Sequence, residues 1–198
     1  MNKPGKLPRL FYEQPTLKVA RQLLGKYLVH NDNGVQRVGR IVETEAYQGP
    51  KDLAAHSARG CTERNRVMFG PAGHAYVYLI YGMWHCVNFV TREAGTPHAV
   101  LIRAVEPVKN LDTRTHGPGL LCAAFNIDRR LNGVDLCGEV LWIEQRGNTS
   151  VSIQRATRIG VDYAGDWADK MWRFYDRDSA YVSTLTAAQR RRMQNEPA

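Results

Sequence analysis

The segment from His74 to Val90 is the most β-prone part of this chain and constrains its fold most strongly. It reads HAYVYLIYGMWHCVNFV, rich in aromatic and β-branched residues, and Gly82 interrupts it directly after Tyr81. A run of this composition broken by glycine predicts two strands that meet at a tight turn. We therefore expect a β-hairpin with Tyr81 exposed at its tip.

Other segments predict further short strands joined by turns. Residues 26–47 contain two β-prone stretches around an Asn-Asp-Asn-Gly turn, which is typical of a hairpin. Residues 98–107 predict a strand ended by Pro107, and residues 139–145 predict another.

Helical signals are few and short. Residues 15–26 predict a helix with Thr16 as the N-cap and Gly25 as the stop, and residues 117–127 predict a short buried helix. Residues 152–178 indicate loop, a short helix and irregular structure. The fold class is therefore α+β, with a mainly antiparallel curved β-sheet, flanking short helices and a protruding β-hairpin.

The chain length of 198 residues fits one compact domain over residues 1–198. We expect residues 1–8 to form a flexible basic arm and residues 188–198 a flexible tail. No stretch resembles a signal segment or a membrane span, so we expect an intracellular, soluble protein with no membrane contact.

The four cysteines are widely separated and lack the spacing of a zinc site, so we expect no metal. Cys86 and Cys122 have apolar neighbours, which is typical of reduced core residues.

The chain is basic, with 27 Lys and Arg against 19 Asp and Glu, a net charge of +8 and a pI near 9.5. A basic surface rich in arginine is expected of a protein that binds polyanions such as nucleic acids. A soluble basic protein without such a partner has the same composition, so charge alone leaves both interpretations open.

The stretch IVETEAYQGPKDLAAHS, residues 41–57, places two glutamates two positions apart. On a strand, Ile41, Glu43, Glu45 and Tyr47 would share one face, and the two carboxylates would lie about 7 Å apart. That spacing suits the acid and base of an inverting glycosidase. The same spacing occurs in any Glu-x-Glu strand, where the carboxylates often bind arginine.

Five motifs in this order carry a resemblance: GRIVETEAYQGPKDLAAHS, RNRVMFGPAG, YVYLIYGMWHCVN, VLIRAVEP and GPGLLCAAFNI. Together they resemble the alkyladenine (3-methyladenine) DNA glycosylase family, and the likeness extends from about Pro8 to Val182. The resemblance implies base excision from duplex DNA that contains a damaged base.

The resemblance implies catalytic roles for two residues. Glu45 matches the general base that activates the attacking water, and Arg103 matches the residue that helps to hold that water and the carboxylate. Glu43 would then support the site or pair with an arginine such as Arg40 or Arg66.

The resemblance also implies which residues contact the damaged base. Tyr47 matches the aromatic residue that stacks on the flipped base, Tyr78 a pocket aromatic on its other side, and His56 a hydrogen-bonding partner of the base or its sugar–phosphate. Asn88 matches the asparagine that rejects guanine, and Tyr81 matches the wedge that fills the gap in the duplex. Further candidates for DNA or pocket contacts are Arg59, Arg64, Arg66, Val161 and Asp162.

The expected substrates are 3-methyladenine and other alkylated purines, with hypoxanthine and ethenoadenine as additional candidates. Because none of the matched site positions is a lysine that could form a Schiff base, the resemblance implies a monofunctional enzyme without strand cleavage. We expect no cofactor and a monomer. The alternatives are a nucleoside or sugar hydrolase that uses Glu43 and Glu45, and a non-catalytic nucleic-acid-binding protein.

Overall fold

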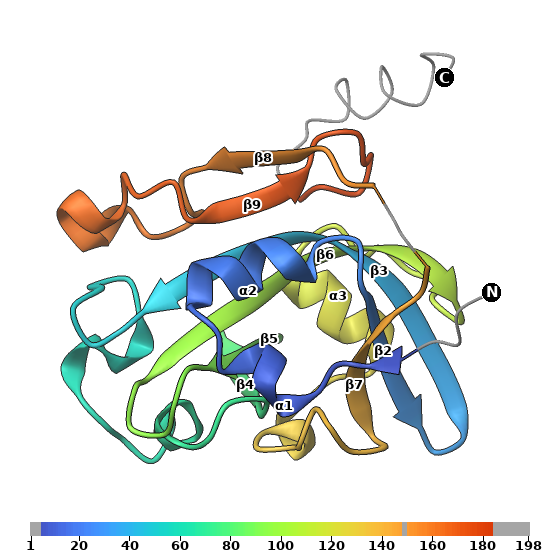
Figure 1. Cartoon of the computed structure of the whole chain (residues 1–198), viewed down its shortest axis with the longest axis horizontal. Coiled ribbons are helices and arrows are strands. Elements are labelled where there is room, and N and C mark those ends of the chain that lie inside the picture. The colour runs from blue at the N-terminus through green and yellow to red at the C-terminus, as the bar shows by residue number, and fades with distance from the viewer. Residues whose placement is uncertain (1–4, 148–149, 184–198) are drawn as a thin grey trace.

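One antiparallel sheet dominates the computed structural model, which describes residues 5–147 and 150–183 (Figure 1). Within these residues the sheet has nine strands, with the main order β1-β7-β2-β3-β6-β5-β4. Strand β9 pairs with β3 and β8, so a short ribbon extends from the middle of the sheet. The prediction of a mainly antiparallel α+β domain is confirmed.

The described strands are β1 (Gly5–Lys6), β2 (Tyr27–Asp32), β3 (Val35–Gln48), β4 (Ala75–Ile80), β5 (Trp84–Thr91), β6 (His98–Lys109), β7 (Leu141–Gln145), β8 (Ile153–Ala156) and β9 (Arg173–Asp176). The α-helices are α1 (Arg9–Tyr12), α2 (Thr16–Leu23) and α3 (Pro118–Phe125). The short 3₁₀ helices are η1 (His56–Arg59), η2 (Arg66–Phe69), η3 (Arg129–Leu131) and η4 (Asp162–Trp167).

Both predicted hairpins are confirmed. Strands β2 and β3 meet at Asn33 and Gly34, and β4 and β5 meet at Tyr81 and Gly82. All four turn residues have positive φ angles, which asparagine and glycine tolerate well and tyrosine does not. Tyr81 is nevertheless 84% exposed at the turn, as the sequence predicts.

The core lies between the sheet and helices α2 and α3. Helix α2 packs on β3 and β6, and α3 packs on β5 and β6. The two helices share one apolar cluster with the sheet, to which they contribute Val19, Ala20, Leu23, Leu121, Cys122 and Phe125. Cys86 and Cys122 are buried free thiols, as expected.

The long pair β3–β6 contains three register shifts, and two of them lie next to Glu43. Val42 of β3 and Arg103 of β6 have no partner across the ladder, and the register is restored from Thr44 onward. Ile41 therefore joins Ala46 in the core, although an unbroken strand would place them on opposite faces. The expectation that Ile41 shares a face with Glu43 and Glu45 is wrong because of this bulge.

Three further expectations are corrected. Pro107 lies inside β6, which continues to Lys109, beside an irregularity where Val108 lacks a partner. Residues 152–178 contain the paired strands β8 and β9, which lack the apolar alternation of an ordinary strand. Thr16 is the first residue of α2 rather than its N-cap, and its Oγ1 lies 3.0 Å from Thr91 Oγ1 and 2.9 Å from His98 Nδ1.

The expected arm over residues 1–8 is wrong for residues 5–7. Gly5 and Lys6 pair with β7, and the Leu7 amide donates to the Ile143 carbonyl while its side chain is buried. Residues 1–4 and the expected tail at 188–198 lie outside the described residues. Within the described part of the chain, no helix has the length and apolarity to cross a membrane.

Candidate active site

A cavity of about 130 Å³ opens beside the C-terminal end of β3. Its wall includes residues from β3, η1, β4, β5 and β6 and from the loop before η4, among them Tyr47, His56, Tyr78, Asn88, Arg103 and Ile159. The volume is below the roughly 300–1,000 Å³ of pockets for drug-sized ligands and suits a single planar ring system.

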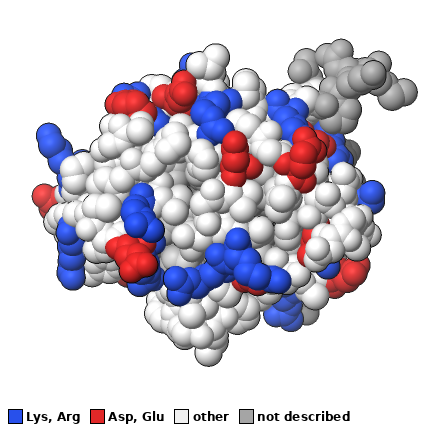
Figure 2. Space-filling model, turned by 90° about the horizontal axis from the view of Figure 1, so that it is seen from below, with Lys and Arg blue, Asp and Glu red and all other residues white. Residues whose placement is uncertain are grey.

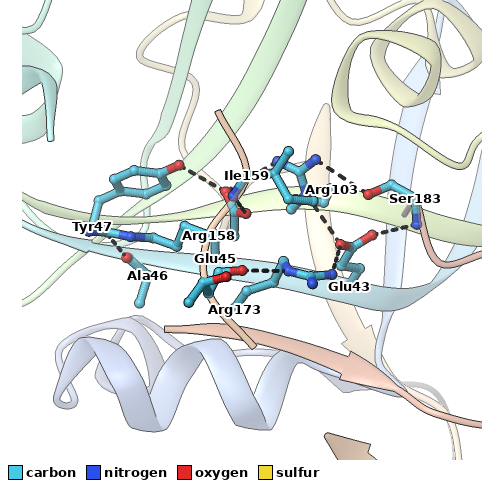
Figure 3. Close-up of polar contacts among 10 residues, drawn as sticks. Glu43, Glu45, Ala46, Tyr47, Arg103, Arg158, Ile159, Arg173 and Ser183 are labelled. Carbon is cyan, nitrogen blue, oxygen red and sulfur yellow. Dashed lines mark hydrogen bonds and ion pairs between the residues drawn. The ribbon is translucent and has the colours of Figure 1, made fainter. Parts of the chain in front are cut away.

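Glu45 lies behind this wall with both carboxylate oxygens hydrogen-bonded (Figure 3). Oε2 accepts from the Tyr47 hydroxyl at 2.8 Å and from Arg103 Nη1 at 3.2 Å, and Oε1 accepts from the Ile159 amide at 2.8 Å. Glu45 is fully buried, while all three donors line the cavity. The carboxylate is therefore held directly behind the cavity by groups that also face it.

Local structure explains how these groups meet. Glu45 and Tyr47 are two residues apart on β3, so their side chains leave the same face. Arg103 occupies the irregular position on β6, and Ile159 lies in the loop between β8 and η4. Burial lowers the pKa of Arg103, but the nearby carboxylates of Glu45 and Glu43 raise it by more, so it stays charged. The pKa of Tyr47 lies well above 10 because the phenol is buried and sits beside Glu45.

Glu43 lies on the same side of β3 and shares Arg103 with Glu45, but its other partners differ (Figure 3). It pairs with Arg103 and with Arg173, whose Nη1 lies 3.0 Å from Glu43 Oε1. The expected pairing of Glu43 with an arginine is found, but Arg40 and Arg66 are not the partners. Arg40 instead bridges Glu106 and Asp176.

An ion pair between Asp52 and Arg158 closes the cavity wall behind Tyr47. Both side chains are fully buried, with Arg158 Nη1 2.5 Å from Asp52 Oδ2 and Nη2 2.9 Å from Oδ1. Nη1 also donates to the Ala46 carbonyl, and the guanidinium carbon lies 4.8 Å from the centre of the Tyr47 ring. Arg158 thus ties the β3 strand to the loop that carries the Ile159 amide.

Sequence reasoning missed Asp52, Arg158 and Ile159. The contact of Ile159 with Glu45 is made by a backbone amide, so no side-chain pattern could indicate it. Asp52 and Arg158 lie 106 residues apart, and nothing local predicts that they meet.

Aromatic rings and His56 form the side of the cavity next to η1. The imidazole of His56 lies edge-on to Tyr78 with ring centres 4.5 Å apart, and its Nδ1 lies 3.0 Å from the Tyr76 hydroxyl. Arg64 donates to the Leu79 carbonyl at 3.0 Å, and its guanidinium lies 5.6 Å from the centre of the Tyr78 ring. Burial, and then the charge of Arg64, lower the pKa of His56, which favours a neutral imidazole.

Asn88 and Val161 also line the cavity, as the resemblance implies. Asn88 is buried and its Nδ2 donates to the Tyr76 carbonyl at 3.4 Å. Asp162 is exposed and does not line the cavity, whereas its neighbour Tyr163 does. The signal for Tyr163 was an aromatic residue two positions after the matched Val161.

The remaining candidates lie outside the cavity. Arg59 and Arg66 are exposed, and Arg59 lines an adjacent groove together with Arg64 and His56. Figure 2 shows one face of the molecule, on which basic side chains form a row and most acidic groups lie beside basic ones. Among the described residues, no three or more His, Cys, Asp and Glu side chains gather as metal ligands.

The comparisons with known proteins match nearly the whole chain. The model of the methylpurine-DNA glycosylase family matches residues 10–180. A protein of Legionella pneumophila (strain Lens) named "Putative 3-methyladenine DNA glycosylase" is 56% identical over 179 residues, which cover 90% of this chain and 98% of that protein.

Proteins with the same name occur in other bacteria. The one from Myxococcus xanthus is 56% identical over 89% of this chain and 93% of its own length. The one from Alkaliphilus oremlandii is 49% identical over 90% of this chain and 98% of its own length. The chain therefore belongs to the methylpurine-DNA glycosylase family and is a DNA glycosylase, an enzyme of base excision repair.

Proposed function

We propose that this enzyme flips damaged purines out of duplex DNA and hydrolyses their N-glycosidic bond with a water activated by Glu45. The substrates are 3-methyladenine and other alkylated purines, with hypoxanthine and ethenoadenine as further substrates. The observation that carries the proposal is the buried Glu45 carboxylate, whose three hydrogen-bond donors all line one small aromatic cavity.

The hydrogen bonds of Glu45 favour water activation. Each carboxylate oxygen can accept about two hydrogen bonds. Among the described residues, Oε2 accepts two and Oε1 accepts one, from the Ile159 amide. Oε1 therefore retains a position for the proton of an attacking water. The carboxylate also stabilises the positive charge that develops on the sugar as the bond breaks.

The aromatic wall suits a flat base. In the proposed complex Tyr47 stacks on one face of the base, Tyr78 lies toward the other, and His56 hydrogen-bonds the base or its sugar–phosphate. An N-alkylated purine is cationic, so each aromatic face adds about 0.5–2 kcal/mol of cation–π attraction. Asn88 lies in the same wall, where its amide would clash with the exocyclic amine of guanine.

The leaving group decides whether one carboxylate is enough. A cationic alkylated base departs as a neutral molecule without protonation, so Glu45 suffices for these substrates. Hypoxanthine and ethenoadenine are neutral and need a proton, for which we assign no residue. We therefore expect faster release of cationic bases than of neutral ones.

Tyr81 acts as the wedge in this proposal. It is 84% exposed at the tip of the β4–β5 hairpin, where a ring can enter the duplex and replace part of the lost stacking. Arg59, Arg64 and Arg66 contact the phosphates of the same DNA, and the enzyme acts inside the cell as a monomer.

We further propose that the enzyme is monofunctional. Among the described residues that line the cavity, none is a lysine, so none can form a Schiff base with the abasic sugar. Borohydride should therefore trap no covalent adduct with lesion DNA. A trapped adduct would contradict this assignment.

The experiment uses duplex oligonucleotides that carry one hypoxanthine or one ethenoadenine, together with alkylated genomic DNA. After incubation, alkali should cleave at the abasic sites that base loss leaves behind. The same enzyme preparation is assayed for duplex binding. Tight binding without base release from any of the three substrates would contradict the proposed activity.

A further inference from the structure

Glu43 is fully buried and accepts hydrogen bonds from three separate parts of the chain. Oε1 accepts from Arg103 Nε at 3.3 Å and from Arg173 Nη1 at 3.0 Å, and Oε2 accepts from the Ser183 amide at 2.7 Å. A buried carboxylate costs several kcal/mol unless it is paired in this way, so these contacts fix its position.

The β3–β6 pair is irregular at this point. The unpaired position of Val42 directly precedes Glu43, and the unpaired position of Arg103 faces it from β6. Ile102 and Val105 consequently share the core although they are three residues apart on the strand. Bulges re-aim side chains, and here they turn Glu43 and Arg103 toward each other on the side of the sheet that carries Glu45.

Glu43 and Glu45 differ in whether their hydrogen-bond donors line the cavity. Every donor to Glu45 lines the cavity, whereas of the donors to Glu43 only Arg103 does. Arg173 lies on β9 and Ser183 near the end of the described residues, away from the cavity wall. Among these contacts of the described residues, Arg103 is the one that joins Glu43 to the cavity wall.

We propose that Glu43 is a positioning residue that acts through Arg103. Glu43 holds the Arg103 guanidinium by its Nε, so that Nη1 keeps its contact with Glu45. The negative charge of Glu43 also offsets part of the positive charge of Arg103 that acts on Glu45. The inference rests on the proposed role of Glu45 as the base.

The charged groups around Glu43 and Glu45 make the positioning role of Glu43 measurable. Glu43, Glu45, Arg103 and Arg173 carry two negative and two positive charges in one buried group, so each change of charge alters the potential at Glu45. The titratable and charged groups that face Glu45 or its nearest partners are Glu43, Tyr47, Asp52, Tyr78, Cys86, Arg103, Arg158 and Arg173.

The first experiment measures single-turnover excision of a lesion base by Glu43→Gln over a range of pH. The glutamine cannot accept from both arginines and the Ser183 amide, so Arg103 loses its anchor, and we expect a rate roughly 10- to 100-fold lower. Loss of the negative charge of Glu43 makes the surroundings of Glu45 more positive, which favours the ionised form of that carboxylate. The acidic limb of the pH–rate profile should therefore move to lower pH. The affinity for lesion duplex should stay at the wild-type value.

Arg173→Gln is the complementary variant. It removes a positive charge from the same group, so the acidic limb should move to higher pH, opposite to the shift in Glu43→Gln. Arg173→Gln keeps Glu43 on Arg103 and tests the proposal even where Glu43→Gln does not fold. Glu106→Gln is the matched control, because Glu106 lies on β6 three residues after Arg103 and pairs with Arg40 outside the site.

Two outcomes would overturn the inference. One is a Glu43→Gln enzyme with the wild-type rate and pH profile; the other is a lower rate with an unmoved acidic limb in both variants. The proposed function fails separately, when Glu45→Gln excises bases as well as the wild type. If the Glu45→Gln enzyme is inactive and the Glu43→Gln enzyme excises bases like the wild type, only the positioning role of Glu43 is contradicted.

Discussion

At the scale of single residues, the site depends on hydrogen bonds to one buried carboxylate. The Tyr47 hydroxyl is bound to Glu45 Oε2, and its ring lines the cavity. In the proposed mechanism Tyr47 therefore has two separable tasks, orientation of the carboxylate by its hydroxyl and contact with the base by its ring.

Tyr47→Phe separates these tasks. It removes a hydrogen bond to a charged group, worth about 1.5–3 kcal/mol, so single-turnover excision should fall roughly 10- to 100-fold. Because the ring remains, affinity for lesion duplex should change little. Tyr47→Leu should lose affinity as well, and Tyr27→Phe on β2, outside the site, should match the wild type. A Phe variant with full activity would show that the hydroxyl has no role.

His56 provides a pH-dependent test of the cavity. Its pKa lies below the ordinary value of 6.5, mainly because the ring is partly removed from solvent and then because of the charge of Arg64. The unfolded chain therefore binds a proton on this imidazole more readily than the folded chain. The resulting contribution to stability is present above pH 6.5 and is lost as the pH falls through the folded pKa.

Arg64→Gln removes the positive charge next to this imidazole. The pKa of His56 should rise toward 6.5, which NMR titration of its ring protons can measure. Arg155→Gln, a change at an exposed arginine on β8, should leave the titration unaltered. An unchanged pKa in Arg64→Gln would show that Arg64 does not act on His56.

At the scale of structural elements, the β4–β5 hairpin presents Tyr81 without any packing requirement. Tyr81→Ala should leave the unfolding temperature unchanged but weaken binding to lesion duplex and slow the flipping step. Leu10→Ala is a suitable control, because Leu10 is another exposed apolar residue, on α1. Equal lesion binding by Tyr81→Ala and the wild type would contradict the wedge assignment.

The Asp52–Arg158 pair joins β3 to the loop before η4 and contributes to stability. Asp52→Asn leaves a buried arginine without its carboxylate, which should cost about 3–5 kcal/mol in the free energy of unfolding. The exposed pair of Lys6 and Glu139 is the matched control, and Glu139→Gln should cost no more than about 1 kcal/mol. Denaturant unfolding measures both, and equal small losses would contradict the account.

The elements differed in how far the sequence could predict them. Hairpins β2–β3 and β4–β5 and helices α2 and α3 carry local signals, namely turn residues, β-branched runs and a glycine stop, and all four were predicted. Strands β8 and β9 were missed because Arg155, Arg173 and Asp176 break the apolar alternation. The bulge at Val42 has no local signal, so the face of Ile41 was assigned wrongly.

At the scale of the whole molecule, the net charge of +8 predicts DNA binding that weakens as salt rises. Each phosphate that the protein neutralises releases its counterions and contributes about 0.9 to the slope of log affinity against log salt. Arg59→Gln and Arg64→Gln should each reduce that slope by about 1, with Arg155→Gln as the control. Unaltered slopes in both variants would place the phosphate contacts elsewhere.

The sequence motifs indicated most of the cavity wall but not how its parts are held together. Tyr47, His56, Tyr78, Asn88, Arg103 and Val161 were expected at the site, and all line the cavity. The buried pairs Asp52–Arg158 and Glu43–Arg173 join residues 106 and 130 positions apart, so only the folded chain reveals them. Resemblance thus indicated residues that meet at one cavity, while tertiary structure was needed to explain the electrostatics around them.

The central claim is that Glu45 activates the water that releases the damaged base. Its most direct test is single-turnover release of 3-methyladenine from alkylated duplex DNA by the wild type and by Glu45→Gln, with duplex binding measured in parallel. We predict a rate roughly 10²- to 10⁴-fold lower for Glu45→Gln at unchanged affinity for DNA. Release of the base by Glu45→Gln at the wild-type rate would contradict the claim.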